Sequence, residues 1–223
     1  MIYLTDVSRL DPADPFWLGF VSESRRQKIE RCARVEDKQR SLGAELLLCY
    51  AIANEAPDLA LPPAYKLRTD GKPFFADGRW HVSFAHSGKY AACALFTTSV
   101  GVDIQSHREA DRRALQKALT KNQIDMIAAM PPNKQHDAYF DFWCMKESLV
   151  KCVDGVSLLQ PAEFQFANLQ GRLAVFYDNY TLRSFGVVPG YSLAVCCEAA
   201  FSPLIVHPSI DKIKETLQTK KPV

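Results

Sequence analysis

The feature that most constrains the fold of this chain is an order of predicted elements that occurs twice, a long helix followed by a run of strands. In the first half, apolar residues at helical spacing predict a helix over residues 36–54, and three predicted strands follow between residues 80 and 104. In the second half, a predicted helix over residues 134–153 precedes four predicted strands between residues 163 and 198. Helices and strand runs grouped in this way predict an α+β fold.

Shorter segments complete the predicted order. The strand over residues 90–96 is almost wholly apolar, so we expect it to be central and buried on both faces. The chain is expected to divide into an N-terminal half, residues 1–99, and a C-terminal half, residues 100–223. The other expected elements are strands over residues 2–5 and 65–68, helices over 22–34, 110–119 and 121–129, and a weak helix after residue 209.

Composition excludes several functional classes. The 223 residues carry a formal net charge of only +2, so the chain lacks the overall basic field of a nucleic-acid-binding protein. The longest apolar run, Leu46 to Ala53, is far shorter than the roughly 20 residues that span a bilayer, and the first residues do not resemble a secretory signal. The seven cysteines include no CxxC pair, which favours buried thiols and a cytoplasmic location.

One candidate for chemistry is the predicted strand with the sequence GVDIQ, residues 101–105. Side chains alternate along a strand, so Asp103 and Gln105 face one way. A carboxylate and an amide oxygen on one face are ligands that a hard cation such as Mg²⁺ accepts. A strand with one solvated face explains the same pattern, so this motif alone leaves both interpretations open.

A second candidate is the sequence WCMKESLVK, residues 143–151. On a helix, Trp143, Glu147 and Lys151 share one face because they are four residues apart. A carboxylate and a cation on one stripe suit a metal ion beside a phosphate. A solvent-exposed ion pair worth about 0.3–0.5 kcal/mol is the alternative, although the aromatic Trp143 on the same stripe argues against full exposure.

Two further motifs offer phosphate-binding groups. The first is the turn Gly71-Lys72-Pro73, followed by His86-Ser87-Gly88 after a predicted strand, where free amides, a hydroxyl and an imidazole can bind phosphate oxygens. The second is the basic stretch that starts at Arg25 and includes Lys28, its neighbour on a helix. A solvated helix face and an ordinary polar loop are the alternatives. A nucleic-acid site is disfavoured because no aromatic residues alternate with these cations.

Taken together, these elements resemble the Sfp-type 4′-phosphopantetheinyl transferases. The order of basic helix, GKP turn, strand leading to HS, GVDI and WCMKESLVK is that of the family, and closing strands with PGYSLAVC follow. Asp103 and Glu147 lie 44 positions apart, which is similar to the family spacing. The resemblance extends over residues 2–198.

The resemblance implies a fold and a reaction. It implies a monomer of two similar α/β halves related by a pseudo-twofold axis, with coenzyme A bound between them. The N-terminal half would hold the adenine and 3′-phosphate, and the C-terminal half the metal and pyrophosphate. The reaction would be the Mg²⁺-dependent transfer of 4′-phosphopantetheine from coenzyme A to a serine of an apo acyl or peptidyl carrier protein, with release of 3′,5′-ADP and without nucleic acid or membrane partners.

The resemblance also implies roles for individual residues. Asp103, Glu147 and Gln105 would be the metal ligands, and Glu147 and Lys151 the catalytic residues. Lys151 and Lys146 would contact the pyrophosphate. The remaining coenzyme A contacts would be His86, Arg25, Lys28 and Ser41 at the 3′-phosphate, and Gly71, Lys72 and Pro73 at the adenine.

The sequence departs from the family pattern at four positions. Gln105 stands where many members carry a third metal-binding carboxylate, and Gln123 where they carry a glutamate proposed as general base. Glu147 is then the strongest candidate base, with Asp125 a weaker one. The other two departures are Ala85 for a serine and Ser83 for an asparagine. These departures motivate an alternative function, a weak or inactive relative that binds coenzyme A or a carrier protein.

The carrier protein and its pathway are not encoded in these motifs. Carriers of fatty-acid, polyketide and nonribosomal-peptide synthesis all fit the resemblance, which implies docking near the helices that follow Asp103. Met126, Ile127 and Met130 offer an apolar docking patch there, with core packing as the alternative for at least half of them.

Overall fold

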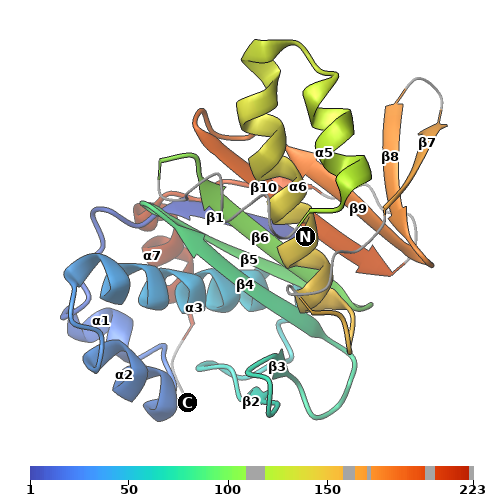
Figure 1. The fold of residues 1–223 in the computed structure, drawn as a ribbon. Coiled ribbons are helices and arrows are strands. Elements are labelled where there is room, and N and C mark those ends of the chain that lie inside the picture. Colours follow the sequence, from blue (N-terminus) through green and yellow to red (C-terminus); the bar gives the residue numbers. More distant parts are fainter. Residues whose placement is uncertain (109–118, 158–163, 170–171, 199–203, 221–223) are drawn as a thin grey trace. The chain divides into compact units, whose positions relative to one another are not determined.

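The computed structural model describes residues 1–108, 119–157, 164–169, 172–198 and 204–220 (Figure 1). The chain separates into two compact units. Unit 1 comprises Met1–Thr97 and Pro203–Val223, and unit 2 comprises Thr98–Ser202. Both contain helices packed on a mainly antiparallel sheet, so the α+β class expected from the sequence is confirmed.

Unit 1 is built on a four-stranded sheet with the order β11-β1-β5-β4. Its strands are β1 (Ile2–Asp6), β4 (His81–Ser87), β5 (Tyr90–Phe96) and β11 (Ile205–Val206). The apolar strand β5 lies between β1 and β4 and is antiparallel to both, which confirms the central position predicted from its composition. The long helix α3 (Val35–Glu55) packs against β5 and β4 (Figure 1).

Shorter elements surround this core. Helix α2 begins after Ser22, whose hydroxyl oxygen accepts a hydrogen bond from the Arg25 amide at 3.3 Å and so caps the helix. The remaining elements of unit 1 are α1 (Pro15–Leu18), α2 (Glu23–Glu30), the hairpin of β2 (Lys66–Leu67) and β3 (Pro73–Phe74), and α7 (Ile210–Gln218).

Unit 2 is a five-stranded antiparallel sheet with the order β6-β10-β9-β8-β7. The helix α6 (Pro132–Cys152) packs on β6 and β10 through apolar residues such as Phe140, Cys144 and Leu149, which are at most 1% exposed (Figure 1). The other elements of unit 2 are β6 (Val100–Ser106), α5 (Lys121–Ala128), β7 (Gln165–Leu169), β8 (Arg172–Tyr177), β9 (Tyr180–Phe185) and β10 (Tyr191–Glu198).

Gly101 sets how closely α6 approaches β6. A Cβ atom at this position would overlap the carbonyl oxygen of Ser148 and lie 2.8 Å from the amide nitrogen of Cys152. Contacts this short do not occur in folded proteins, so any larger residue would push the helix away from the strand. The glycine of the GVDI motif is therefore a packing requirement, and it brings the two elements with candidate metal ligands together.

The structure departs from the sequence expectations at three places. Residues 203–223, expected in the C-terminal half, belong to unit 1, because β11 pairs with β1 and the Thr5 hydroxyl donates to the Pro208 carbonyl oxygen at 2.8 Å. Helix α6 begins at Pro132, two residues before its predicted start, since the first helical turn needs no amide hydrogen. His86 and Ser87 lie within β4, paired with β5, rather than after the strand.

Three further expectations concern the helix predicted over residues 110–119, membrane-spanning segments and the cysteines. The helix predicted over residues 110–119 falls almost entirely on residues outside the described ranges. Among the described residues, no helix is long and apolar enough to cross a membrane. All seven cysteines are free thiols, and six of them are buried, as the sequence predicts.

Candidate active site

The site in unit 2 is formed by the middle of β6 and the last turns of α6. Asp103 lies on β6 opposite Ala194 of β10 and is 7% exposed. Glu147 and Lys151 lie one turn apart on α6 and are half-buried, as expected for one face of the helix. The close contact of β6 with α6 at Gly101 brings these side chains to one place.

Lys151 is bound to β6 by two hydrogen bonds. Its ammonium group donates to Asp103 Oδ1 at 2.8 Å and to the Val102 carbonyl oxygen at 3.1 Å. Burial opposes the charge of Lys151, but the Asp103 carboxylate beside it prevails and raises the pKa of the lysine. Lys151 is therefore a fixed cation beside Asp103 rather than a mobile surface lysine.

The second oxygen of Asp103 is left without a partner. Asp103 Oδ2 is buried and has no hydrogen-bond partner among the described residues. A buried carboxylate oxygen that accepts nothing is costly unless a cation or a donor from a ligand satisfies it. This atom therefore indicates a place for a bound cation.

Glu147 shares the electrostatic surroundings of Asp103. Burial raises the pKa of Glu147, the negative charge of Asp103 raises it further, and Lys151 lowers it in part. Two neighbouring carboxylates of this kind favour the binding of a divalent cation, which would relieve their repulsion. The structure thus brings together the two acidic residues, which the sequence places 44 positions apart.

The donor set suits magnesium. Carboxylate oxygens from Asp103 and Glu147, with the amide oxygen of Gln105 on the same strand, are hard ligands of the kind that Mg²⁺ prefers, and Mg²⁺ keeps waters at its other positions. Gln105 is half-exposed, and its amide nitrogen donates to the Ser106 carbonyl oxygen at 3.3 Å. Its amide oxygen is then the atom suited to the metal.

Lys146 differs from Lys151 in its surroundings. It lies on the same helix but is only 1% exposed, and burial lowers the pKa of its ammonium group. A buried lysine is better suited to a fixed anionic partner than to free solvent. Its contact with pyrophosphate stays a prediction.

Gln123 is part of a helix cap. The Thr120 amide donates to Gln123 Oε1 at 3.1 Å and the Gln123 amide donates to Thr120 Oγ1 at 3.2 Å, which is the reciprocal arrangement of a capping box at the start of α5. Gln123 is 1% exposed, so its side chain serves the helix start. The T-x-x-Q spacing of this capping box is visible in the sequence.

Asp125 does not share this environment. Its side chain is 65% exposed and lies 4.0 Å from the Lys121 ammonium group. This exposure contrasts with the buried Gln123, and it leaves Glu147 as the stronger candidate base. The proposed docking residues are also divided, because Ile127 is fully buried in the core while Met126 and Met130 are half-buried.

Unit 1 contains a buried ionic cluster around Arg25. The Arg25 Nε atom lies 3.0 Å from Glu45 Oε2, and an Nη atom donates to the Tyr65 hydroxyl at 2.6 Å. The Tyr65 hydroxyl donates in turn to Glu45 Oε2 at 2.8 Å. Glu45 is fully buried, and burial raises its pKa while Arg25 lowers it. Glu45 was not predicted as a site residue from the sequence. A lone carboxylate within the most apolar part of α3 is the pattern that could have indicated a buried, paired charge.

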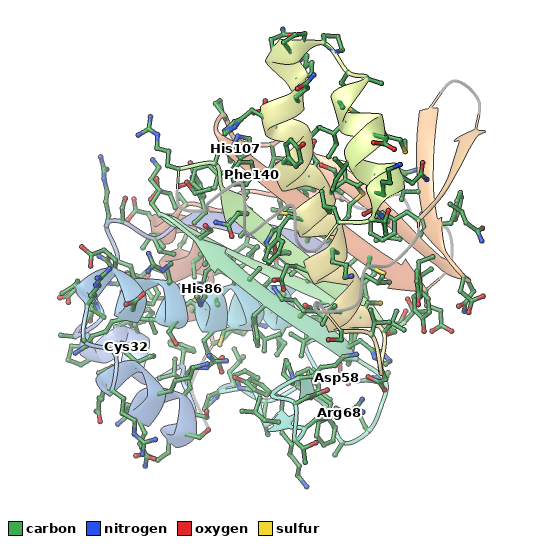
Figure 2. All side chains as sticks on the ribbon, viewed as in Figure 1. Cys32, Asp58, Arg68, His86, His107 and Phe140 are labelled. Atoms are coloured by element: carbon green, nitrogen blue, oxygen red, sulfur yellow. The ribbon has the colours of Figure 1, made fainter. Side chains whose placement is uncertain are left out.

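The other predicted phosphate contacts in unit 1 have more varied exposure. Lys28 is exposed, and its charge lowers the pKa of Glu45, so it lies near the Arg25 cluster. His86 is exposed on β4 (Figure 2). Ser41 is 5% exposed, and its hydroxyl oxygen is buried without a hydrogen-bond partner among the described residues. An unsatisfied hydroxyl of this kind suits a ligand contact.

The predicted adenine turn is a tight loop between β2 and β3. Gly71 has a φ of +86°, which other residues adopt rarely. The Asp70 carboxylate accepts a hydrogen bond from the Lys72 amide at 2.9 Å, and the Gly71 amide donates to the Arg68 carbonyl oxygen at 2.9 Å. Lys72 and Pro73 are half-buried beside the turn.

We expect Arg25→Ala to destabilise unit 1 by about 3 kcal/mol, because it leaves the Glu45 carboxylate buried without its cation. Lys28→Ala removes an exposed charge and should change stability by less than about 0.5 kcal/mol. Urea unfolding followed by tryptophan fluorescence measures both, since Trp17 and Trp80 report on unit 1. The double variant Arg25→Leu with Glu45→Leu should recover most of the loss, and an Arg25→Ala protein as stable as the parent would contradict the buried pair.

Residues 99–196 match the family model described as the 4′-phosphopantetheinyl transferase superfamily. The 4′-phosphopantetheinyl transferase Sfp of Bacillus subtilis is 25% identical over 187 residues, covering 81% of this chain and 83% of that protein. The transferase ffp of Bacillus subtilis is 27% identical over 186 residues, with 80% and 83% covered. The transferase gsp of Aneurinibacillus migulanus is 25% identical over 183 residues, with 79% and 76% covered.

A solved structure of holo-[acyl-carrier-protein] synthase from Thermotoga maritima aligns with a TM-score of 0.35 and 12% identity, covering 46% of this chain and 64% of that chain. The matched family segment contains β6 and α6, and with them Asp103, Glu147 and Lys151. Residues 99–196 are therefore similar to the 4′-phosphopantetheinyl transferase superfamily. The chain is also similar to 4′-phosphopantetheinyl transferases such as Sfp over about four fifths of its length.

Proposed function

We propose that this protein transfers 4′-phosphopantetheine from coenzyme A to a serine of an apo acyl or peptidyl carrier protein and releases 3′,5′-ADP. One observation carries the proposal. The buried, unpartnered Oδ2 atom of Asp103 lies in the electrostatic environment of Glu147 and beside the fixed cation of Lys151, all within the segment that matches the superfamily.

The residues that would hold Mg²⁺ are Asp103, Glu147 and Gln105, since all three offer oxygen ligands. When bound, the metal ion would offset the negative charge of the coenzyme A diphosphate. Glu147 and Asp103 together carry the charge that attracts the cation, and the ammonium group of Lys151 limits their repulsion.

The reaction is a phosphoryl transfer, in which positioning and charge stabilisation supply most of the rate enhancement. The oxygen of the carrier serine forms a bond to the phosphorus next to the pantetheine arm, and the bond from that phosphorus to 3′,5′-ADP breaks. Lys151 would stabilise the charge that develops on the leaving oxygen. Glu147 would take the serine proton, directly or through a bridging water.

The residues of unit 1 would bind the nucleotide end of coenzyme A. Lys28, His86 and Ser41 are the proposed contacts of the 3′-phosphate. Lys28 and His86 are exposed and can carry positive charge, and the Ser41 hydroxyl has no hydrogen-bond partner among the described residues. Arg25 would add charge there while paired to Glu45. Gly71, Lys72 and Pro73 would receive the adenine, and Lys146 with Lys151 the pyrophosphate.

The test of this function is a mass measurement. The protein is incubated with coenzyme A, Mg²⁺ and an apo carrier protein, and the carrier is weighed by mass spectrometry. We expect the carrier mass to rise by one phosphopantetheine group, and a carrier with its serine changed to alanine to stay unmodified. Carriers from fatty-acid, polyketide and nonribosomal-peptide synthesis are tested in parallel, since the site does not distinguish them. Binding of coenzyme A without any mass change would support the weak or inactive relative instead.

His86→Ala should raise the KM for coenzyme A by about 10- to 150-fold, because it removes a charged hydrogen bond worth about 1.5–3 kcal/mol. The KM for 3′-dephospho-coenzyme A should change little, since that substrate lacks the group in question. Steady-state kinetics with both substrates measures the difference. Equal effects on the two substrates would remove His86 from the 3′-phosphate site.

The cellular setting is part of the same proposal. A cytoplasmic location is supported by the seven free cysteines, which suit a reducing compartment. A monomer that acts on coenzyme A and a carrier protein, with no nucleic acid, is the assembly we propose.

A further inference from the structure

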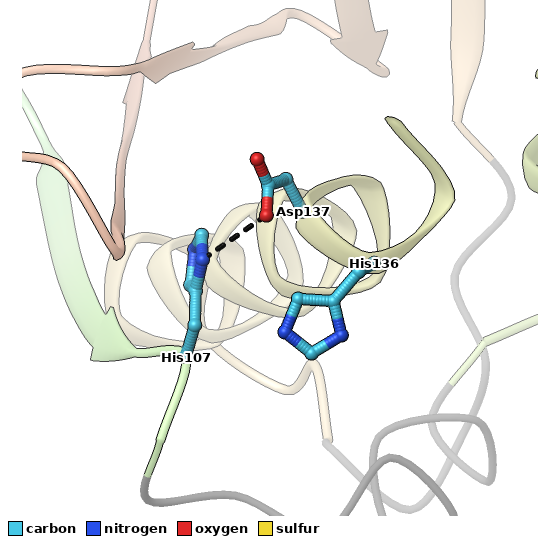
Figure 3. A group of neighbouring side chains, drawn as sticks. All are labelled: His107, His136 and Asp137. Carbon is cyan, nitrogen blue, oxygen red and sulfur yellow. Dashed lines mark ion pairs between the residues drawn. The ribbon is translucent and has the colours of Figure 1, made fainter. Parts of the chain in front are cut away.

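A second group of ligand-type side chains lies at the other end of α6. His107 follows β6 by one residue, and His136 and Asp137 lie in the first turns of α6. One ligand atom from each lies within 4.8 Å of the others. Figure 3 shows His107 reaching from the segment after β6 toward α6, where the other two side chains are adjacent. His136 and Glu147 are separated by about 16 Å along the helix, so this group is distinct from the Asp103 site.

The hydrogen bonds around Ser192 fix the proton on His107. The Ser192 hydroxyl donates to Asp141 Oδ1 at 2.6 Å, and the Ser184 hydroxyl donates to the same oxygen at 2.7 Å. A hydroxyl has one hydrogen, so Ser192 has none left for the His107 Nε2 atom, 3.0 Å from its oxygen. Nε2 must therefore carry the hydrogen and donate it to Ser192.

This assignment leaves the other ring nitrogen of a neutral His107 as an acceptor. Its Nδ1 atom lies 3.2 Å from Asp137 Oδ1, which is also an acceptor (Figure 3). Two atoms with lone pairs this close need a positive group between them, which is either a proton on Nδ1, as in an ion pair with Asp137, or a bound metal ion. Metal-binding histidines in proteins show the same pattern, in which one nitrogen donates to a neighbouring oxygen and the other faces the metal.

Aromatic packing holds the ring of His107 in place. Its ring stacks on Phe140 with centroids 4.5 Å apart, and the ring of His136 meets the same phenylalanine edge-on at 5.2 Å. Phe140 is 1% exposed, and Figure 2 shows His107 beside it. One ligand is thus rigid and the two on α6 are exposed, an arrangement that can close on an ion with small side-chain rotations.

We propose that His107, His136 and Asp137 bind a transition-metal ion of the zinc class. Imidazole nitrogens suit Zn²⁺, Ni²⁺ and Cu²⁺, whereas Mg²⁺ prefers oxygen, so the two sites select different metals. Zinc bonds of about 2.0–2.2 Å place tetrahedral ligands about 3.4 Å apart, which rotation of His136 and Asp137 can reach. Three protein ligands leave at least one position for water or an external ligand.

The bound ion would link the end of β6 to the start of α6. These two elements carry Asp103 and Glu147, so the link would stabilise the frame of the Asp103 site without touching it. An ion that binds only the folded state stabilises the protein by RT ln(1 + L/Kd), where L is the free ion concentration, so the stabilisation grows with the logarithm of that concentration. The inference does not depend on the transfer reaction.

The test is a Zn²⁺ titration of the full chain against a chromophoric chelator, with excess Mg²⁺ present. We expect one zinc site, and at least about tenfold weaker zinc binding in His136→Gln and in Asp137→Asn. Removing a residue that only supports a metal ligand already weakens metal binding by about this factor, so removing a ligand should weaken it at least as much. Zinc should raise the melting temperature of the parent and not that of His136→Gln. Both substitutions are at exposed positions, so folding is preserved.

Two matched controls separate this site from other zinc ligands. His207→Gln removes an exposed histidine of unit 1 and should leave zinc binding unchanged. Glu147→Gln should also leave it unchanged, because that residue belongs to the oxygen site. Unchanged zinc binding in both His136→Gln and Asp137→Asn, or a thiolate charge-transfer band with Co²⁺, would overturn the proposal, since the ion would then lie elsewhere.

Discussion

Glu147→Gln is expected to lower the turnover of carrier-protein modification by at least about 100-fold while the protein stays folded. General-base catalysis alone contributes about 10²- to 10⁴-fold, and the same change removes a charged metal ligand. The amide keeps the shape of the side chain. Because burial and Asp103 disfavour the ionised form of Glu147, the neutral amide should leave the melting temperature equal or higher. The measurement combines single-turnover kinetics with a thermal melt.

Asp125→Asn is the matched control for this result. It makes the same carboxylate-to-amide change at a side chain that is 65% exposed and paired with Lys121. We expect parental turnover from this variant. Near-normal turnover of Glu147→Gln would exclude Glu147 as the base and as an essential ligand, whichever metal is supplied.

Gly101→Ala is expected to destabilise unit 2 by about 1–3 kcal/mol or more and to reduce transfer strongly. The added methyl group would overlap the Ser148 carbonyl oxygen, which belongs to the backbone of α6 and has no rotamer to change. The helix must shift away from β6 and take Glu147 and Lys151 with it. Displacements of about 1 Å in a catalytic site can cost about 100-fold in rate.

The readouts are urea unfolding and the kinetics of the same preparation. Trp143 lies half-buried on α6, so its fluorescence reports on the helix that must move. Gly186→Ala is the matched control, since an added Cβ there meets nothing within 4 Å and its φ is not positive. A Gly101→Ala protein with parental stability and rate would show that β6 and α6 are not packed as described.

Local sequence patterns predicted most of the secondary structure. The strand β5 has the predicted bounds, and α6 differs from its predicted bounds by two residues at its start and one at its end. The alternation of β6 and the four-residue spacing of Glu147 and Lys151 are also local properties. They predicted which side of each element carries the polar groups, because the periods of a strand and a helix fix side-chain directions.

The side-chain contacts of the site residues were harder to predict from the sequence. Arg25 was predicted to contact a phosphate, and the structure adds a buried ion pair between Arg25 and Glu45, a residue 20 positions away. Gln123 was interpreted as standing in the place of a general base, and in the structure its side chain caps the start of α5. His107 and His136 were not singled out, because their proximity depends on how β6 and α6 pack together.

Local patterns of residues were enough to predict most helices and strands, the side of β6 that carries Asp103, and the face of α6 that carries Glu147 and Lys151. Each of these follows from interactions between residues a few positions apart. The tertiary structure alone decided that Lys151 pairs with Asp103, that Arg25 pairs with Glu45, and that residues 203–223 join unit 1. The reason is physical. These pairings depend on which apolar faces are buried against each other, and periodicity shows that a face is buried without showing what covers it.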